Sequence, residues 1–281
     1  MRNFVDLHTH SIRSDGQLTP VEVVRLAEGK RLAAVALTDH DTVAGLAEAE
    51  RAARSLEVRF VPGVEVSAKF GGGTLHILGL GISSGDRRLG AVLRRLAEAR
   101  RRRNPKIIVR LRAAGVDVTL GQWRQFAGES GMVGRLHLAK LLCLKGYAAN
   151  ISQAFGRYIG SAGVGFVDKE CLTPAEVIDA IHAAGGLAVL AHPPELKFAN
   201  FAQLDRFVGA LAREARRLEL WGELRREQLD ALIEAGVPLT FYSVPADQLG
   251  EVAIAHRRSR RHRLGLGVHA HLVGIYPGMT R

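Results

Sequence analysis

Short apolar runs alternate with amphipathic stretches along the first third of the chain. Apolar runs near residues 4–6, 33–38, 60–66 and 74–80 have the length of buried strands, and helical periodicity follows the first two. Thr19-Pro20 followed by Glu22 predicts a helix start, because Thr and Glu at this spacing form a capping box that tolerates Pro in the first turn. This alternation of strand and helix is typical of a parallel α/β architecture.

A long helical pattern begins near residue 88 and interrupts this alternation. Residues 89–111 are arginine-rich with helical period, a second capping box begins at Thr119, and helical segments follow at 136–145 and 152–159. A third capping box at Thr173 precedes an apolar run at 187–191, and weaker signals predict helices at 204–218 and 225–235 and a strand at 238–242. We therefore expect a helical insertion in an α/β frame.

Composition narrows the class of protein and its partners. The chain has 281 residues, 47% of them hydrophobic, which is enough for a full core and excludes a small disulfide-stapled fold. Its two cysteines, Cys143 and Cys171, lack zinc-site spacing, which favours a reducing cytoplasm and partners them with the core as small hydrophobes. The net charge of +11 favours nucleotides or RNA as partners, and no apolar stretch is long enough to predict a membrane span or an export signal.

Histidines and carboxylates follow the predicted strands. His8 and His10 are two residues apart, so on an extended segment both imidazoles project to the same side. The further candidate ligands are Asp15, His40, Glu65, His76 and His192. All of these except His76 lie where an apolar run gives way to polar sequence, and the carboxyl ends of strands converge on one face in α/β barrels. We expect these side chains to meet in one pocket.

Imidazole and carboxylate together suit manganese, iron or zinc, so the pattern predicts two or three divalent ions. Clustered divalent ions catalyse phosphoryl transfer without a protein nucleophile, which assigns catalysis to the metal-holding set His8, His10, Asp15, His40, Glu65 and His192. For a single histidine the structural alternative is a hydrogen-bonded residue, and His182 in a helical pattern is assigned to it. Asp39 and Asp41 either cap the next helix or support the ligands.

Several of these segments resemble the ordered motifs of the PHP (polymerase and histidinol phosphatase) domain family. The matching segments are Asp6-Leu7-His8-Thr9-His10, Ser14-Asp15-Gly16, Thr38-Asp39-His40-Asp41-Thr42, Pro62-Gly63-Val64-Glu65 and Ala191-His192-Pro193. Within the family, residues 97–111, 134–139 and 154–167 are similar to bacterial phosphoesterases of the nucleoside 3′,5′-bisphosphate phosphatase and 5′-3′ exoribonuclease type.

The resemblance implies a distorted (β/α)7 barrel with a metal site, usually of manganese, that hydrolyses nucleotides or the 5′ end of short RNA. The barrel would comprise residues 1–95 and 166–250, with residues 96–165 as a helical lid and residues 251–281 as a basic tail. Arg135 and His137 match the lid motif that grips phosphate, the alternative being a surface charge and a helix-capping histidine. Residues 100–103 either rim a nucleic-acid entrance or form a solvent-exposed helix face. No protein partner is predicted.

The C-terminal part departs from the family pattern. Relatives place Asp and His ligands in a Gly-Ser-Asp-x-His stretch, whereas residues 239–247 read LTFYSVPAD. Asp247, His256, His262, His269 or His271 could substitute, and Glu219 fits a family strand loosely. The departure predicts a weakened metal site. Two alternatives therefore stay open: a phosphatase for small esters such as histidinol phosphate, and a nucleic-acid-binding protein with impaired catalysis.

Overall fold

The protein has a mixed α/β fold built on one six-stranded sheet. The computed structural model describes residues 5–71, 73–128 and 132–192, together with 196, 198–200, 203–204, 206–207, 210–211 and 219–220. The strands lie side by side in chain order and are β1 (Val5–Thr9), β2 (Ala34–Leu37), β3 (Arg59–Phe70), β4 (Gly73–Leu80), β5 (Leu187–Leu190) and β6 (Glu219–Leu220). Across these described residues the sheet is open, with β1 and β6 at its edges.

The sheet is not wholly parallel. β1, β2 and β3 are mutually parallel, and β5 is parallel to β6, but β4 is antiparallel to both β3 and β5. The expectation of a parallel architecture was therefore wrong for residues 74–80. The physical reason is the glycine-rich connection after Phe70, which is too short for a crossover and long enough for a hairpin turn.

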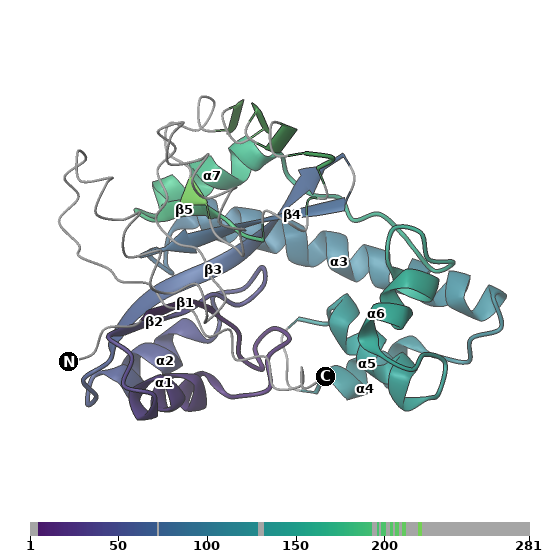
Figure 1. The fold of residues 1–281 in the computed structure, drawn as a ribbon, viewed down its shortest axis with the longest axis horizontal. Helices are drawn as coiled ribbons and strands as arrows, with labels where there is room; N and C mark the ends of the chain where they lie inside the picture. Colours follow the sequence, from purple (N-terminus) through teal and green to yellow (C-terminus); the bar gives the residue numbers. More distant parts are fainter. Residues whose placement is uncertain are drawn as a thin grey trace.

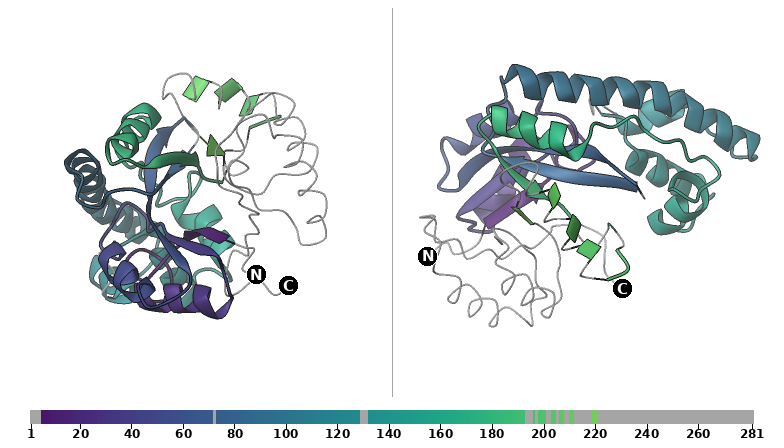
Figure 2. Two further views of the ribbon diagram at one scale, coloured as in Figure 1. Left: turned by 90° about the vertical axis from the view of Figure 1, so that its left-hand side faces the viewer. Right: turned by 90° about the horizontal axis from the view of Figure 1, so that it is seen from above.

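Helices cover one face of the sheet, as Figures 1 and 2 show. These are α1 (Pro20–Gly29), α2 (Leu46–Ala53), α7 (Pro174–Ala183) and the first half of α3 (Arg87–Ala113). Successive residues of β2 point to opposite faces: Val35 and Leu37 join the large apolar cluster under the helices, while Ala34 and Ala36 join a smaller cluster on the other face. The candidate ligands belong to this second face.

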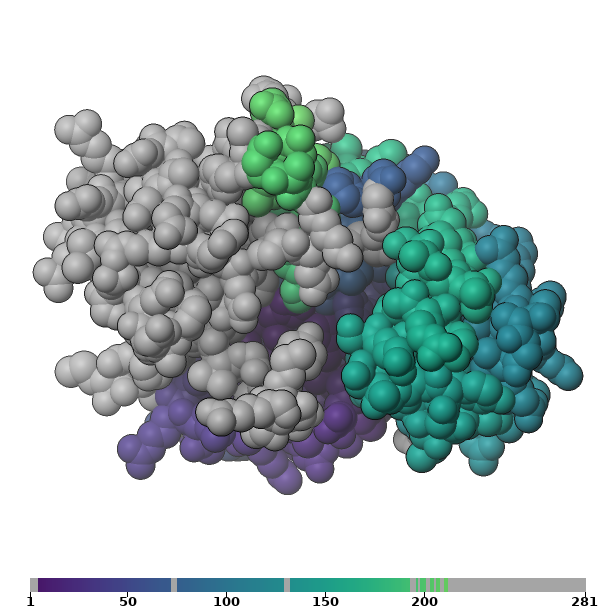
Figure 3. Space-filling model, turned by 45° about the vertical axis from the view of Figure 1, so that its right-hand side comes forward, coloured from purple at the N-terminus to yellow at the C-terminus, as the bar shows by residue number. Residues whose placement is uncertain are grey.

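The long helix α3 links the sheet to a second apolar cluster. Its residues Leu89 and Leu96 pack in the cluster of the sheet, whereas Ile107 and Leu111 pack among the other helices. Those helices are α4 (Leu120–Ala127), α5 (Arg135–Leu144), α6 (Ile151–Ala154) and the π-helix η1 (Phe155–Ile159), which we call the helical cluster. In the space-filling view this cluster forms a teal lobe beside the purple N-terminal segment (Figure 3). The division at residues 95 and 96 stays a prediction.

The local helix signals in the sequence are confirmed. Thr19, Thr119 and Thr173 each form the predicted capping box, with Glu22, Gln122 and Glu176 as reciprocal partners. Cys143 and Cys171 are free thiols and only partly buried, so they are not fully buried core residues as expected. Among the helices of the described part of the chain, none has the length and apolar character of a membrane span. Residues 225–235, 238–242 and 251–281 lie outside the described residues.

Candidate metal centre

Glu65 lies at the centre of the candidate site. It is in β3, where the neighbouring residues Val64 and Val66 point into the apolar cluster under the helices, so its carboxylate points to the opposite face. The side chain is completely buried. A buried carboxylate requires compensating partners, and the partners here are imidazoles.

Five imidazoles surround this carboxylate. Nitrogen atoms of His8, His10 and His40 lie 3.0, 3.2 and 3.1 Å from Oε2 of Glu65, and those of His76 and His192 lie 3.0 and 3.2 Å from Oε1. The rings also face one another, with centroids 4.6 Å apart for His10 and His40 and 4.8 Å apart for His8 and His192. Five sequence-distant imidazoles therefore share one pocket.

Asp15 adds a second carboxylate at the edge of this group. Its oxygens lie 3.5 Å from Nε2 of His40 and 3.8 Å from Nδ1 of His10. The potential ligand atoms fall into three overlapping sets: His8, His10 and Glu65; His10, Asp15 and His40; and His40, Glu65 and His76. Within each set, the atoms lie within 4.8 Å of one another. All seven predicted ligand residues are thus brought together.

Each ligand reaches the pocket by a different local device. His8 ends β1 and His10 follows it, and His40 follows β2 and forms an isolated bridge with Glu65. His76 lies within β4 opposite Ser67, two positions along β3 from Glu65, so the antiparallel register carries it to the site. His192 follows β5 with φ of +47°, a conformation that non-glycine residues rarely adopt. Such backbone strain is common where a side chain must point into a functional site.

The protonation equilibria of the pocket are far from those of free side chains. Burial lowers the pKa of His8 to about 4 and that of His40 to about 4. Burial also opposes protonation of His10, but Glu65 and Asp15 outweigh it and raise its pKa to about 9. Burial alone would raise the pKa of Glu65, yet His40, His8 and His76 hold it well below its usual range.

The donor set suits divalent cations. A carboxylate offers about four lone-pair sites and cannot accept from five imidazoles at once, so part of the imidazole nitrogens have no good use in the absence of a cation. Neutral imidazoles and carboxylates at these separations are the ligands that manganese, iron and zinc accept. The residues present therefore fit the divalent metals that the sequence predicts.

Two further aspartates hold the ligand loops. Asp39 accepts hydrogen bonds from the amide and hydroxyl of Ser11, at 2.7 and 2.6 Å, and from the hydroxyl of Ser14 at 2.6 Å. Asp41, with φ of +51°, accepts from the amide and hydroxyl of Ser67 at 2.7 and 3.0 Å. The alternative that they cap the next helix is wrong, because α2 begins after Gly45 with no side-chain cap. Both aspartates instead orient the segments that carry His10, Asp15 and His40.

The turn that carries Asp15 depends on a glycine. A Cβ atom on Gly16 would lie 2.3 Å from the carbonyl oxygen of His10, far inside contact distance. The carbonyl of Asp15 also lies 3.4 Å from Nζ of Lys140 in α5, so the helical cluster touches the metal loop. The Ser14-Asp15-Gly16 motif therefore has a packing reason as well as a chemical one.

The two predicted phosphate-binding residues are in different situations. His137 is buried and its Nδ1 accepts the amide hydrogen of Gly134 at 3.2 Å, so it caps the start of α5 as the structural alternative stated. Arg135 donates to the carbonyl of Ile159 at 3.4 Å and lies 6.0 Å from the centre of the Phe155 ring. A role of either residue in binding phosphate stays a prediction.

Three buried cations were missed in the sequence. Arg100 and Arg103 are 9% and 6% exposed, and Lys169 is equally hidden, with its side chain 8% exposed. Between them in α3, Arg101 and Arg102 have side chains 69% and 54% exposed and form the predicted solvent-exposed face. The three-residue spacing of Arg100 and Arg103 is the signal that separates the two kinds. The proposed substitutes Asp247, His256, His262, His269 and His271 lie outside the described residues, and so does the side chain of Glu219.

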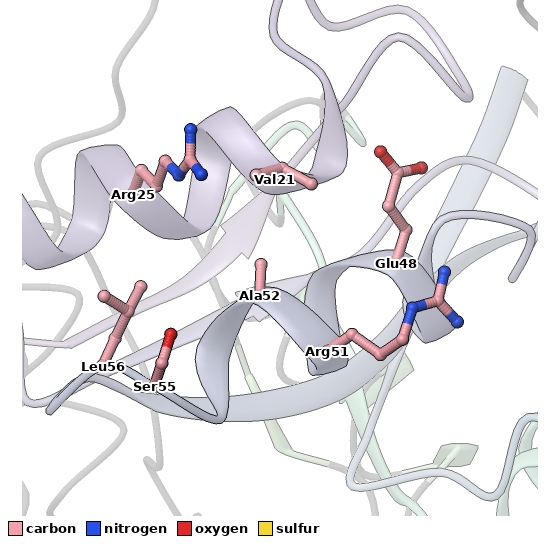
Figure 4. A pocket seen from close by; sticks show the side chains of 7 residues that line it. All are labelled: Val21, Arg25, Glu48, Arg51, Ala52, Ser55 and Leu56. Atoms are coloured by element: carbon pink, nitrogen blue, oxygen red, sulfur yellow. The ribbon is translucent and has the colours of Figure 1, made fainter.

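A shallow pocket lies apart from the metal centre, between α1 and α2. Arg25, Glu48 and Arg51 line it together with small and apolar side chains (Figure 4). It shares no residue with the candidate ligands. Glu48 is paired with Arg13 at 3.1 Å, so part of its charge is already used.

Comparison with known proteins places the chain among phosphoesterases. It is 38% identical over 188 residues to a 5′-3′ exoribonuclease of Haemophilus influenzae, covering 67% of this chain and 68% of that protein. It is 38% identical over 189 residues to a 3′,5′-nucleoside bisphosphate phosphatase of Chromobacterium violaceum, covering 67% of this chain and 66% of that one. The chain thus matches about two thirds of the length of these relatives.

Solved structures agree with this placement. A Chromobacterium violaceum protein described as an amidohydrolase with bound sulfate and no metal has a TM-score of 0.77 at 29% identity, covering 86% of this chain and 88% of that one. A metal-dependent phosphoesterase from Bifidobacterium adolescentis has a TM-score of 0.66 at 26% identity, covering 92% and 84%. The PHP domain model itself matches residues 6–123, which contain six of the seven candidate ligands. The chain belongs to the PHP domain family.

Proposed function

We propose that the protein is a metal-dependent phosphoesterase that removes phosphate from nucleoside 3′,5′-bisphosphates or trims short RNA from its 5′ end. The observation that carries the proposal is the buried Glu65 with imidazole nitrogens of five histidines within 3.2 Å, and Asp15 beside them. This constellation has no role in a merely structural core, where a buried carboxylate needs fewer and simpler partners.

The proposed ligands are His8, His10, Asp15, His40, Glu65, His76 and His192, holding two or three ions with manganese as the first choice. Bound divalent ions supply charge stabilisation to phosphoryl transfer and make water nucleophilic near neutral pH. The chain itself orients the ligands through Asp39 and Asp41 and keeps the pocket away from bulk water, since all seven side chains are buried or partly buried.

The substrate class is supported by chemistry and by kinship. The printed functions of the two curated relatives concern nucleotides and RNA, and one related structure holds a sulfate, an analogue of phosphate. The net charge of +11 attracts the same polyanions. We further propose that the sheet is part of a distorted (β/α)7 barrel, that residues 96–165 act as its lid, and that the cytoplasm is the site of action.

The proposal is tested by phosphate release from adenosine 3′,5′-bisphosphate by purified protein supplied with manganese. We expect turnover that is abolished by chelation, restored by manganese and lost in His8→Ala. A His182→Gln variant is the matched control, because His182 lies in α7 outside the cluster.

Two outcomes would overturn parts of the proposal. Turnover of wild type no faster than that of His8→Ala would end the enzymatic reading. Faster release from histidinol phosphate than from the bisphosphate or from a 5′-phosphorylated oligonucleotide would keep the chemistry and replace the substrate.

A further inference from the structure

A cluster of cations lies next to the metal centre, between the sheet and the helical cluster. It consists of Arg100 and Arg103 from α3, Arg135 at the start of α5, and Lys169 from the segment that returns to α7. Arg100 and Lys169 are almost fully buried with ion pairs to the same residue, Asp41, at 3.0 Å in the case of Lys169. We call these four residues the cation cluster.

The cation cluster holds more positive charge than the protein neutralises. Arg103 donates to the neutral side chain of Asn104 at 3.0 and 3.3 Å, and among the described residues it forms no ion pair with a carboxylate. Asp168, the other carboxylate near Arg135, is exposed to solvent. Burying like charges together with so little compensation is unfavourable, so a cluster of this kind is retained for a function.

The titration behaviour of the cluster agrees with this surplus. Burial lowers the pKa of Arg103 to about 9, and the nearby guanidinium groups of Arg135 and Arg100 lower it further. Burial also lowers the pKa of Arg135 and that of Lys169. Each shift has the direction expected for cations that lack an anion.

Asp41 joins the cation cluster to the metal centre. It follows His40, whose Nδ1 lies 3.1 Å from Glu65, while the Asp41 carboxylate turns away to Arg100 and Lys169. Two adjacent residues thus mark the border between a pocket that suits cations and a pocket that suits anions. An Arg has five donors and a Lys three, so Asp41 does not exhaust either side chain.

We propose that Arg100, Arg103, Arg135 and Lys169 bind a phosphate group of the substrate other than the one that is hydrolysed. This inference rests on the proposed function and deepens it. It makes the substrate a molecule with two phosphate groups separated by a nucleoside, one at the metal centre and one at the cation cluster. Guanidinium groups suit this task because their planar donors match phosphate oxygens in pairs. His137 has no part in it, since its Nδ1 caps α5.

The test compares adenosine 3′,5′-bisphosphate with the two adenosine monophosphates that lack one of its phosphates. For wild type we expect a higher kcat/KM with the bisphosphate than with the better monophosphate. Arg103→Met should lower kcat/KM for the bisphosphate by about tenfold or more, as expected for loss of a charged hydrogen bond. The same variant should change kcat/KM for the better monophosphate by less than about twofold. Arg101→Met, two residues away in α3 and exposed, is the matched control and should behave as wild type.

An equal loss with all three substrates, or no loss with any, would overturn the inference. If wild type hydrolyses none of them, the proposed function fails and the anion site is tested by binding alone. Calorimetric titration of chelator-treated protein with adenosine 3′,5′-bisphosphate should then give a Kd at least about tenfold higher for Arg103→Met than for Arg101→Met. Identical Kd values would refute the site independently of catalysis.

Thermal unfolding excludes a trivial loss of structure. Arg103→Met keeps the length of the side chain and removes an unpaired charge, so its melting temperature should equal or exceed that of wild type. Inorganic phosphate should raise the melting temperature of chelator-treated wild type more than that of the variant. If Arg103→Met melts lower, Lys169→Met repeats the comparison, and a phosphate-induced shift as large as in wild type in both variants would refute the site.

Discussion

Two charged clusters lie on either side of Asp41, and they are built on opposite principles. Around Glu65, five histidines and Asp15 offer lone pairs and lack a cation. Around Lys169, arginines offer hydrogen-bond donors and lack an anion. Both clusters are buried, and both cost stability unless their missing partner is bound.

The difference shows how the chain divides one reaction between two kinds of site. The metal centre is formed by strand ends and their loops, which are held by the sheet. The cation cluster is formed by α3, α5 and the segment before α7, where the helical cluster meets the sheet. Movement of the helical cluster would thus change the second pocket more than the first, which is the arrangement expected of a rigid catalytic site with an adaptable substrate site.

The largest effect is expected for Glu65→Gln. The variant removes the charge shared by five imidazoles, and loss of even an outer partner of a metal ligand costs about 10- to 100-fold in metal affinity or activity. We expect phosphate release to fall by at least about 100-fold. Metal analysis of the purified protein should show lower occupancy, whereas Glu50→Gln on the exposed side of α2 should retain it. Wild-type metal content in Glu65→Gln would contradict the assignment.

Asp41→Asn should give the largest change in stability. Asparagine preserves the shape and the hydrogen bonds to Ser67 but removes the charge that Arg100 and Lys169 share. Removing one partner of a buried ion pair leaves unpaired charge, so the free energy of unfolding should fall by about 3 kcal/mol. Urea denaturation of chelator-treated protein measures it. A change of the size seen at exposed residues would mean that Asp41 does not compensate the cluster.

Metal binding should stabilise the protein through the first cluster alone. At a free manganese concentration about 100 times the Kd, linkage adds about 2.7 kcal/mol to the free energy of unfolding. The shift should be measurable in wild type and in Arg103→Met, and it should be absent in Glu65→Gln. Equal stabilisation of Glu65→Gln by manganese would place the bound ion elsewhere.

The smallest effect is expected for Glu170→Gln, which provides the baseline for charges outside both clusters. Glu170 pairs with Arg95 at 3.4 Å and Arg102 at 3.2 Å, but all three side chains are more than half exposed. Such pairs are screened by water, so the free energy of unfolding should change by less than about 0.5 kcal/mol. A loss as large as that of Asp41→Asn would remove the contrast between buried and exposed charges.

The sequence by itself determined the features that depend on a few neighbouring residues. The capping boxes at Thr19, Thr119 and Thr173 set three helix starts, because their hydrogen bonds lie within four residues. It also determined which residues gather at Glu65, since ligand types that follow strands are carried to a common edge. The roles of these residues as metal ligands remain predictions.

The tertiary structure alone decided features that depend on distant partners. β4 runs antiparallel, and its register carries His76 to the site from the middle of a strand, where no apolar run ends. Arg100 and Arg103 are buried while Arg101 and Arg102 are exposed, because one face of α3 meets Asp41 and the segment of Lys169. Periodicity records that a helix has two faces, but what covers each face is set by residues far away in the chain.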